Sequence, residues 1–331
     1  MNPAHENVLT FLARQTVSAA TPLILAGIGE LVSELTGVID IGIEGLMLTG
    51  CIAAYTIAGA TGHGSLGLAT AILAGMAVAA LFAATTISGR ADQIVSGTAL
   101  NLLALGLSGT IWSLYQNWRE NHDLSTALPH GAGYSRQAVG ALARLPFFGP
   151  VFFDQYGLFY AAVLLAALVW VIIRFTRLGL ILRALGDSPQ TCQACGIAVR
   201  TWRWLAVLFA GGCAGAAGAY LSIMRTHAFA TDMTGGQGFV VLALVIFGRW
   251  SMGGLILGCL FFGAINSLQQ TLQTARYTSH YAVLHALQSV PFEVFQMLPY
   301  VAALAALAVL SRNHPGPRQL GRPWPEYTYL S

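Results

Sequence analysis

The sequence predicts an all-α membrane protein, a polytopic bundle of about eight to ten transmembrane helices in a single domain, residues 1–331. Of the 331 residues, 56% are hydrophobic and only 9% are charged, whereas an average soluble domain carries about 25% charged residues. Apolar stretches such as 66–87 and 156–175 run for about 20 residues, the length that a helix needs to cross the hydrocarbon core of a bilayer. A soluble core of this size does not need so many of them.

We expect nine apolar spans along the chain, which gives eight or nine crossings. They are residues 8–31, 36–58, 66–87, 94–115, 156–175, 202–224, 238–248, 253–271 and 291–310. The stretch 238–271 is ambiguous because Gly248, Gly253 and Gly254 interrupt it. It can form two short helices, one bent helix or a re-entrant pair.

The arginines indicate the orientation of the chain, because short cytoplasmic loops carry an excess of positive charge. All 16 basic residues are arginines. Five of them lie in or beside the loop 176–201, against the single acidic residue Asp187, and three lie in the tail 311–331. We expect both segments to be cytoplasmic. Residues 116–155 are polar with balanced charges, which favours an external loop.

The composition also excludes several classes of function. A chain without lysine can form neither a Walker A loop nor the active site of a protein kinase. The small net charge of +3 gives no support to nucleic-acid binding. Cys192 and Cys195 form a Cys-x-x-Cys pair, but the second ligand pair of a zinc site and the strand of a thioredoxin-like site are missing. We therefore expect no catalytic, cofactor or metal site on this chain.

Four carboxylates stand close together between the first two apolar spans, at Glu30, Glu34, Asp40 and Glu44. A charge at the centre of a membrane helix costs about 2.5–3.5 kcal/mol on insertion scales, so these groups should lie near an interface, face protein or line water. The spacing i, i+4 would place Glu30 with Glu34, and Asp40 with Glu44, on shared helix faces. Two interpretations stay open: a solvated interfacial turn, and a structural or gating role at the mouth of a pore.

A short helix is predicted at 189–195 within the arginine-rich loop. Ser188 suits the N-cap, Pro189 the first helical position, and Gly196 the left-handed conformation that ends a helix. So short a helix is unstable alone. Flanking helices or a partner protein must therefore hold it.

Four stretches, taken together, resemble one family. Residues 34–48 are similar to its Glu-x-x-Gly-Val-x-Asn-x-Gly-x-Glu-Gly signature, with Asp40 in place of Asn, and residues 92–106 to its Gln-x-Val-x-Gly-x-x-Leu-Asn segment. Residues 183–197 occupy the position of its coupling helix, and 233–250 end in its Phe-Gly-(Arg/Lys)-Trp motif. The family is the permeases of ribose-type bacterial ABC importers, specifically the nucleoside and simple-sugar branch.

This resemblance implies a type II-like importer permease in the bacterial cytoplasmic (inner) membrane, in contact with lipid. It implies three protein partners: an ABC ATPase that binds MgATP, a second permease that is a different and longer paralogue, and an external solute-binding protein. The chain itself would bind no cofactor. It would translocate a nucleoside or a simple sugar, driven by ATP hydrolysis in the partner subunits.

The resemblance also assigns roles to residues. Contact with the ATPase would be made by the short helix and its flanks, namely Asp187, Ser188, Pro189, Gln193, Ala194 and Gly196. The solute path or its gate would involve Glu34, Asp40, Glu44 and Asn101. For Asn101, an interhelical hydrogen bond is an equally good interpretation.

Rival functions remain at this stage. A stand-alone secondary transporter or channel needs an intramembrane ionisable relay or a filter, and apart from the carboxylates at 30–44 the spans offer little beyond Glu293. A membrane scaffold is a third option. Within the ABC class, the solute could be a nucleoside, a pentose or another sugar, or a vitamin such as riboflavin.

Overall fold

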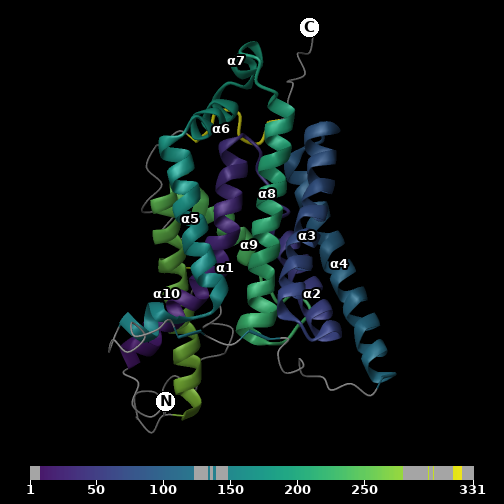
Figure 1. Ribbon diagram of the computed structural model, residues 1–331, viewed down its shortest axis with the longest axis vertical. Helices are drawn as coiled ribbons and strands as arrows, with labels where there is room; N and C mark the ends of the chain where they lie inside the picture. The colour runs from purple at the N-terminus through teal and green to yellow at the C-terminus, as the bar shows by residue number, and fades with distance from the viewer. Residues whose placement is uncertain are drawn as a thin grey trace.

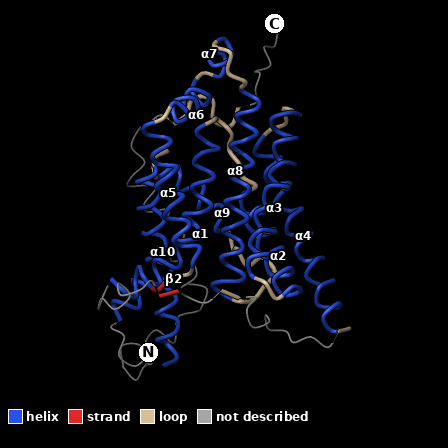
Figure 2. Tube along the Cα trace, in the orientation of Figure 1, coloured by secondary structure: helices blue, strands red, loops and turns tan. Residues whose placement is uncertain are grey.

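The computed structural model describes residues 8–122, 133–134, 137–138, 148–278, 297, 301 and 316–322. Within them the expected all-α bundle is confirmed (Figure 1), and strand is confined to one short antiparallel pair, β1 (Gln137–Ala138) with β2 (Asp154–Gln155) (Figure 2). Seven of the described helices are long and apolar enough to cross a membrane. The chain is therefore a multi-pass membrane protein.

The described part of the chain contains ten α-helices. They are α1 Val8–Leu35, α2 Ile43–Thr61, α3 Gly64–Ala83, α4 Gln93–Glu120, α5 Gly157–Phe175, α6 Arg177–Asp187, α7 Pro189–Ala194, α8 Val199–Ala219, α9 Gln237–Phe247 and α10 Met252–Thr278, with π-helical turns at Ala84–Ser88, Gly149–Phe153 and Tyr220–Thr226.

Several predicted boundaries are corrected. The span expected at 36–58 starts late, because residues 36–42 are not helical. For the stretch 238–271, the first of the three alternatives is confirmed, since it forms two helices, α9 and α10, joined by a tight turn. The loop 176–201 contains an amphipathic helix, α6, that was not predicted. The ninth span, 291–310, lies outside the described residues except for 297 and 301, and so does Glu293.

Helix α1 is the centre of the bundle. Of the residues in its most apolar stretch, 94% are buried within the protein, although α1 has the composition of a helix that faces lipid. It runs antiparallel to α8: the Ser18 hydroxyl meets the Tyr220 hydroxyl near one end, and Arg203 donates to the Thr36 carbonyl near the other. Helix α7 stands beyond this second end (Figure 1). We call it the α7 end, and the other the opposite end.

Glycines bring α2, α3 and α8 into backbone contact. A Cβ on Gly218 of α8 would lie 2.1 Å from the Met47 carbonyl oxygen, and one on Gly75 of α3 would lie 2.2 Å from the Gly211 carbonyl oxygen. Small residues at helix interfaces permit this close approach, which membrane helices use because lipid gives them little hydrophobic drive to associate. These three helices form a tightly packed block.

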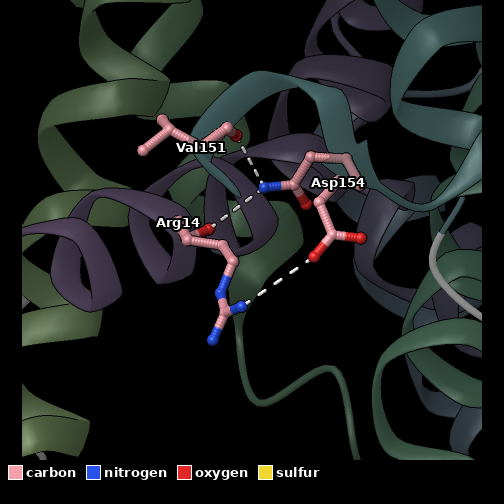
Figure 3. A network of polar contacts seen from close by, with 4 residues as sticks. Arg14, Val151 and Asp154 are labelled. Atoms are coloured by element: carbon pink, nitrogen blue, oxygen red, sulfur yellow. Dashed lines mark hydrogen bonds and ion pairs between the residues drawn. The ribbon is translucent and has the colours of Figure 1, made fainter. Parts of the chain in front are cut away.

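At the opposite end, polar contacts fasten the start of α1 to the segment that precedes α5 (Figure 3). The Gln155 amide donates to the Val151 carbonyl at 2.8 Å and to the Arg14 carbonyl at 3.4 Å. The Arg14 guanidinium lies 4.0 Å from the Asp154 carboxylate, a half-exposed ion pair of small energetic weight. Gln155 is fully buried, so its hydrogen bonds carry most of this connection.

The glycine contacts lead to a stability prediction. We expect Gly218→Ala to lower the free energy of unfolding by about 1–3 kcal/mol, because the new methyl group must push α2 away from α8. The matched control is Gly109→Ala in α4, where a Cβ meets nothing within 4 Å. This change should be neutral or stabilise by up to about 1 kcal/mol, as alanine is the better helix former. Thermal denaturation in detergent measures both; equal melting temperatures for the two variants would contradict the prediction.

Candidate functional site

A break in helical structure lies inside the protein between α1 and α2. Three side chains, one from α1 and two from α4, form hydrogen bonds with its backbone. The Asp40 N–H donates to Glu30 Oε1 at 3.0 Å, the Ile39 N–H to Gln93 Oε1 at 2.9 Å, and the Asn101 amide to the Ile41 carbonyl at 2.9 Å. Backbone groups removed from water must find such partners. The segment 36–42 is thus a non-helical element built into the bundle.

The four carboxylates of this region are buried, so the interpretation as a solvated interfacial turn is wrong. Glu30, Glu34 and Asp40 are 0% exposed and Glu44 is 7% exposed. Asp40 and Glu44 do not share a helix face, because Asp40 lies in the break and accepts the Gly42 N–H at 2.8 Å. Within the described residues, one oxygen each of Glu30, Glu34 and Asp40 has no hydrogen-bond partner. Such burial is costly, because a carboxylate oxygen removed from water loses its hydrogen bonds.

Glu44 connects α2 to the start of α9. It stands in the first turn of α2, and its carboxylate accepts the N–H groups of Gly236, at 2.8 Å, and of Gly238, both at the start of α9. An anion at a helix N-terminus satisfies unpaired N–H groups and complements the helix dipole. Gly238 has to be a glycine here, because a Cβ would lie 2.5 Å from the Glu44 nitrogen.

At the α7 end, three pieces of the chain meet around the end of α1. Glu34 accepts the indole N–H of Trp250, from the turn between α9 and α10. Arg203 of α8, expected at the edge of a loop, is 2% exposed and donates to the Thr36 carbonyl at 3.0 Å. A cation near the C-terminal end of α1 is favoured by the helix dipole. The break therefore begins at a junction of α1, α8 and the α9–α10 turn.

Residues 316–322, which we call the C-terminal strap, lie across this junction. The Gln319 N–H donates to the Gly186 carbonyl at 2.8 Å, and the Gly321 N–H to the Gly37 carbonyl at 3.2 Å. The strap thereby links the end of α6 to the break. Of the predicted tail 311–331, only these residues are described.

The predicted short helix is confirmed as α7, which starts at Pro189 and ends next to Gly196, whose φ of 79° is left-handed. Ser188 is the N-cap residue as predicted, but its hydroxyl accepts no backbone N–H and bonds instead to the Thr191 hydroxyl at 2.7 Å. Gln193 and Ala194 face outward. Asp187 ends α6 and accepts the Arg318 N–H of the strap at 3.4 Å.

Flanking helices hold α7 in place. Cys192 is buried against Leu185 of α6 and Val199 of α8. Burial, and to a lesser extent the neighbouring Cys195, raises the pKa of the Cys192 thiol, which disfavours the thiolate that redox or zinc chemistry needs. Cys192 is thus a packing residue.

Asn101 makes the interhelical hydrogen bonds that were one of its two expected roles. Its amide donates to Ile41, and its oxygen accepts the Gly45 N–H at 2.8 Å. With Gln93 it attaches α4 to the break and to α2. Neither Asn101 nor the predicted path residues Glu34, Asp40 and Glu44 line a described cavity.

A polar cavity does exist at the opposite end, between α1, the end of α8, α9 and α10. It includes Gln15, Arg225 and Gln237, which the sequence reasoning missed. The available signal was a polar side chain in or directly beside an apolar span, which is rare and often functional in membrane proteins.

Comparison with known proteins places these features in context. The pattern of the family described as "Branched-chain amino acid transport system / permease component" matches residues 12–308. The chain is 37% identical to the putative glucose ABC transporter permease protein TsgC13 of Haloferax volcanii, over 80% of this chain and 78% of that protein.

Two further relatives cover almost the full length. The nucleoside ABC transporter permease protein NupC of Lactococcus lactis is 33% identical over 92% of this chain and 93% of its own. The guanosine ABC transporter permease protein NupQ of Bacillus subtilis is 31% identical over 96% of this chain and 97% of its own. No solved structure matches the chain.

The junction at the end of α1 yields a prediction. Trp250→Phe replaces the indole by a smaller aromatic ring and removes the N–H that Glu34 accepts. We therefore expect the free energy of unfolding to fall by about 1–3 kcal/mol, the cost of leaving a buried acceptor unpaired. Trp204→Phe is the control: its indole N–H donates to the half-buried Ser88 hydroxyl at 3.2 Å. A neutral bond of this kind is worth only about 1 kcal/mol. Thermal denaturation that ranks Trp204→Phe as the more damaging change would refute the assignment.

Proposed function

The chain belongs to the family of branched-chain amino acid transport system permease components, and from this premise we propose that it translocates a nucleoside or a simple sugar as one permease of an ABC importer. The observation that carries the proposal is the nearly full-length similarity to NupC and NupQ, whose names specify nucleosides and guanosine. The similarity to TsgC13, named for glucose, keeps simple sugars in the proposal. The relatives of this chain are thus named for different solutes.

The chain supplies a path and a hinge, and its partners supply the energy. With no lysine among its residues, it lacks the side chain that a Walker A loop uses to reach the phosphates of ATP. MgATP would be bound by a separate ABC ATPase. An external solute-binding protein would deliver the solute, and a second, longer permease would complete the pore.

The proposed orientation follows the arginines. The α7 end is cytoplasmic and the opposite end external, in the cytoplasmic membrane of a bacterium. Helix α7 then projects toward the ATPase with Gln193 and Ala194 on its outer surface.

A continuous set of contacts supports a coupling role for α7. Its buried side meets α6 and α8; α6 holds the C-terminal strap through Gly186; and the strap holds the break at Gly37. A push on α7 therefore acts on the one non-helical stretch between α1 and α2. Because Glu44 joins α2 to α9, a movement of the break would also be transmitted to α9.

The proposal is tested by uptake in membrane vesicles that contain the chain with its ATPase, second permease and binding protein. We expect ATP-dependent uptake of [3H]guanosine or [14C]glucose, and no ATP hydrolysis by the purified chain alone. Uptake that survives removal of ATP but is abolished by a proton ionophore would instead indicate a secondary transporter.

The coupling role is tested by Ala194→Glu. A new carboxylate on the outer surface of α7 would have to be desolvated in the ATPase groove, at a cost of several kcal/mol if unpaired. We expect normal insertion into the membrane, but at least a tenfold loss of ATPase association, which corresponds to about 1.4 kcal/mol. Co-purification measures the association.

Ala230→Glu is the matched control for this experiment. It makes the same change at an exposed position of the loop that precedes α9, far from α7. ATPase association should stay at the wild-type level in this variant. If Ala194→Glu behaved like it, α7 would not be the coupling element, and Arg249 and Trp250 on the α9–α10 turn would become the next candidates.

A further inference from the structure

The polar cavity at the opposite end has the size and the lining of a small-molecule site. Its volume is 380 Å³, within the range of about 300–1,000 Å³ that is usual for ligand pockets. It is partly open, and residues of α1 line it together with the end of α8, the start of α9 and α10. Its polar lining consists of Gln15, Ser18, Arg225, Thr226, Gln237 and Gln270.

Some of these polar groups are already satisfied by the protein. The Ser18 hydroxyl meets the Tyr220 hydroxyl at 3.1 Å, and the Thr226 hydroxyl donates to the Leu221 carbonyl at 2.8 Å. By contrast, the half-buried side chains of Gln15 and Gln237 make no hydrogen bond with the described part of the chain, and Arg225 interacts electrostatically with Tyr220 and Tyr156. Polar groups placed in apolar spans without a protein partner are expensive. Gln15 and Gln237, with the donors of Arg225 beside them, point to a ligand that completes their hydrogen bonds.

The charge of the lining restricts the chemistry of that ligand. Among the described residues of the lining, Arg225 is the one side chain with a fixed charge, and none carries a carboxylate. A guanidinium offers donors only, whereas the amides of Gln15 and Gln237 both donate and accept. The cavity therefore suits a solute with carbonyl or ring-nitrogen acceptors and with hydroxyl groups, and it disfavours a cation.

The rest of the lining is apolar or aromatic, namely Tyr156, Leu221 and Met233. Apolar and aromatic side chains accept the flat face of a ring, while the polar groups of the lining fix its orientation. A nucleoside combines these features, since its base is flat and bears acceptors and its ribose bears hydroxyls. We propose that this cavity is a solute subsite that holds a neutral nucleoside in transit through the permease, an inference that rests on the proposed function.

The position of Gln237 connects the subsite to the moving parts. Gln237 is the first residue of α9 and lies between Gly236 and Gly238, the two residues whose N–H groups Glu44 accepts. A shift of α2 that disturbs the Glu44 contact therefore moves a wall of the cavity directly. The same element would sense coupling and hold the solute.

The experiment measures protection of a cysteine at the cavity. Thr226→Cys is introduced in a Cys195→Ser background, which removes the one free thiol of the described chain that is exposed. The complete transporter, in vesicles, is treated from outside with an impermeant thiol reagent, with and without guanosine. At a guanosine concentration ten times its Kd, occupancy of the cavity should slow labelling about tenfold.

Two glutamine variants separate a binding role from a structural one. Gln237→Met keeps the shape but loses the hydrogen bonds, so guanosine should no longer slow labelling, while ATPase association is unchanged. Gln116→Met makes the same change at a half-buried position of α4 that does not line the cavity. In this control, protection should persist.

The outcomes of uptake and of labelling are read independently. ATP-dependent guanosine uptake without any protection would overturn the subsite and leave the proposed function standing. Protection by glucose and not by guanosine would overturn the nucleoside assignment. If no ATP-dependent uptake of either solute occurs, the proposed function fails and the inference fails with it.

Discussion

The structure depends on one constraint, which is that backbone polar groups inside a membrane bundle must be satisfied where a helix is interrupted. The break at 36–42 meets it with the side chains of Glu30 from α1 and of Gln93 and Asn101 from α4. These polar residues are therefore retained in apolar spans for the backbone they support. Because each bond joins two elements, the break is also the place where α1, α2 and α4 are held together.

The bundle contains a second interruption, in residues 227–236 between the end of α8 and α9. Helices α1 and α8 run antiparallel, and each is followed by a non-helical stretch and then by a helix that starts within the protein, α2 or α9. The two starts meet at Glu44, whose carboxylate serves the N-terminus of α9. Discontinuous helices are where transporters commonly combine binding with movement, and here one carboxylate links both discontinuities.

The bundle contains one closely packed group of helices and one group of helices around a polar cavity. Glycine contacts pack α2, α3 and α8 backbone to backbone, which resists small deformations. Beside α1, α9 and α10 lies instead a cavity that is lined largely by polar side chains. In the proposed importer, the packed block would move as a unit, so that a displacement at α7 appears at the cavity as a change of shape.

The sequence by itself determined the fold class, the membrane location, most spans and the short helix α7, because length, apolarity and the residues around Pro189 and Gly196 act locally. It identified the carboxylates at 30–44 as unusual, but it did not determine their environment. Only the tertiary structure decided that they are buried, that Asn101 bonds to α2, and that Gln15, Arg225 and Gln237 share one cavity. These facts depend on contacts between residues up to about two hundred positions apart, and hydropathy and local spacing carry no information about which distant helices meet.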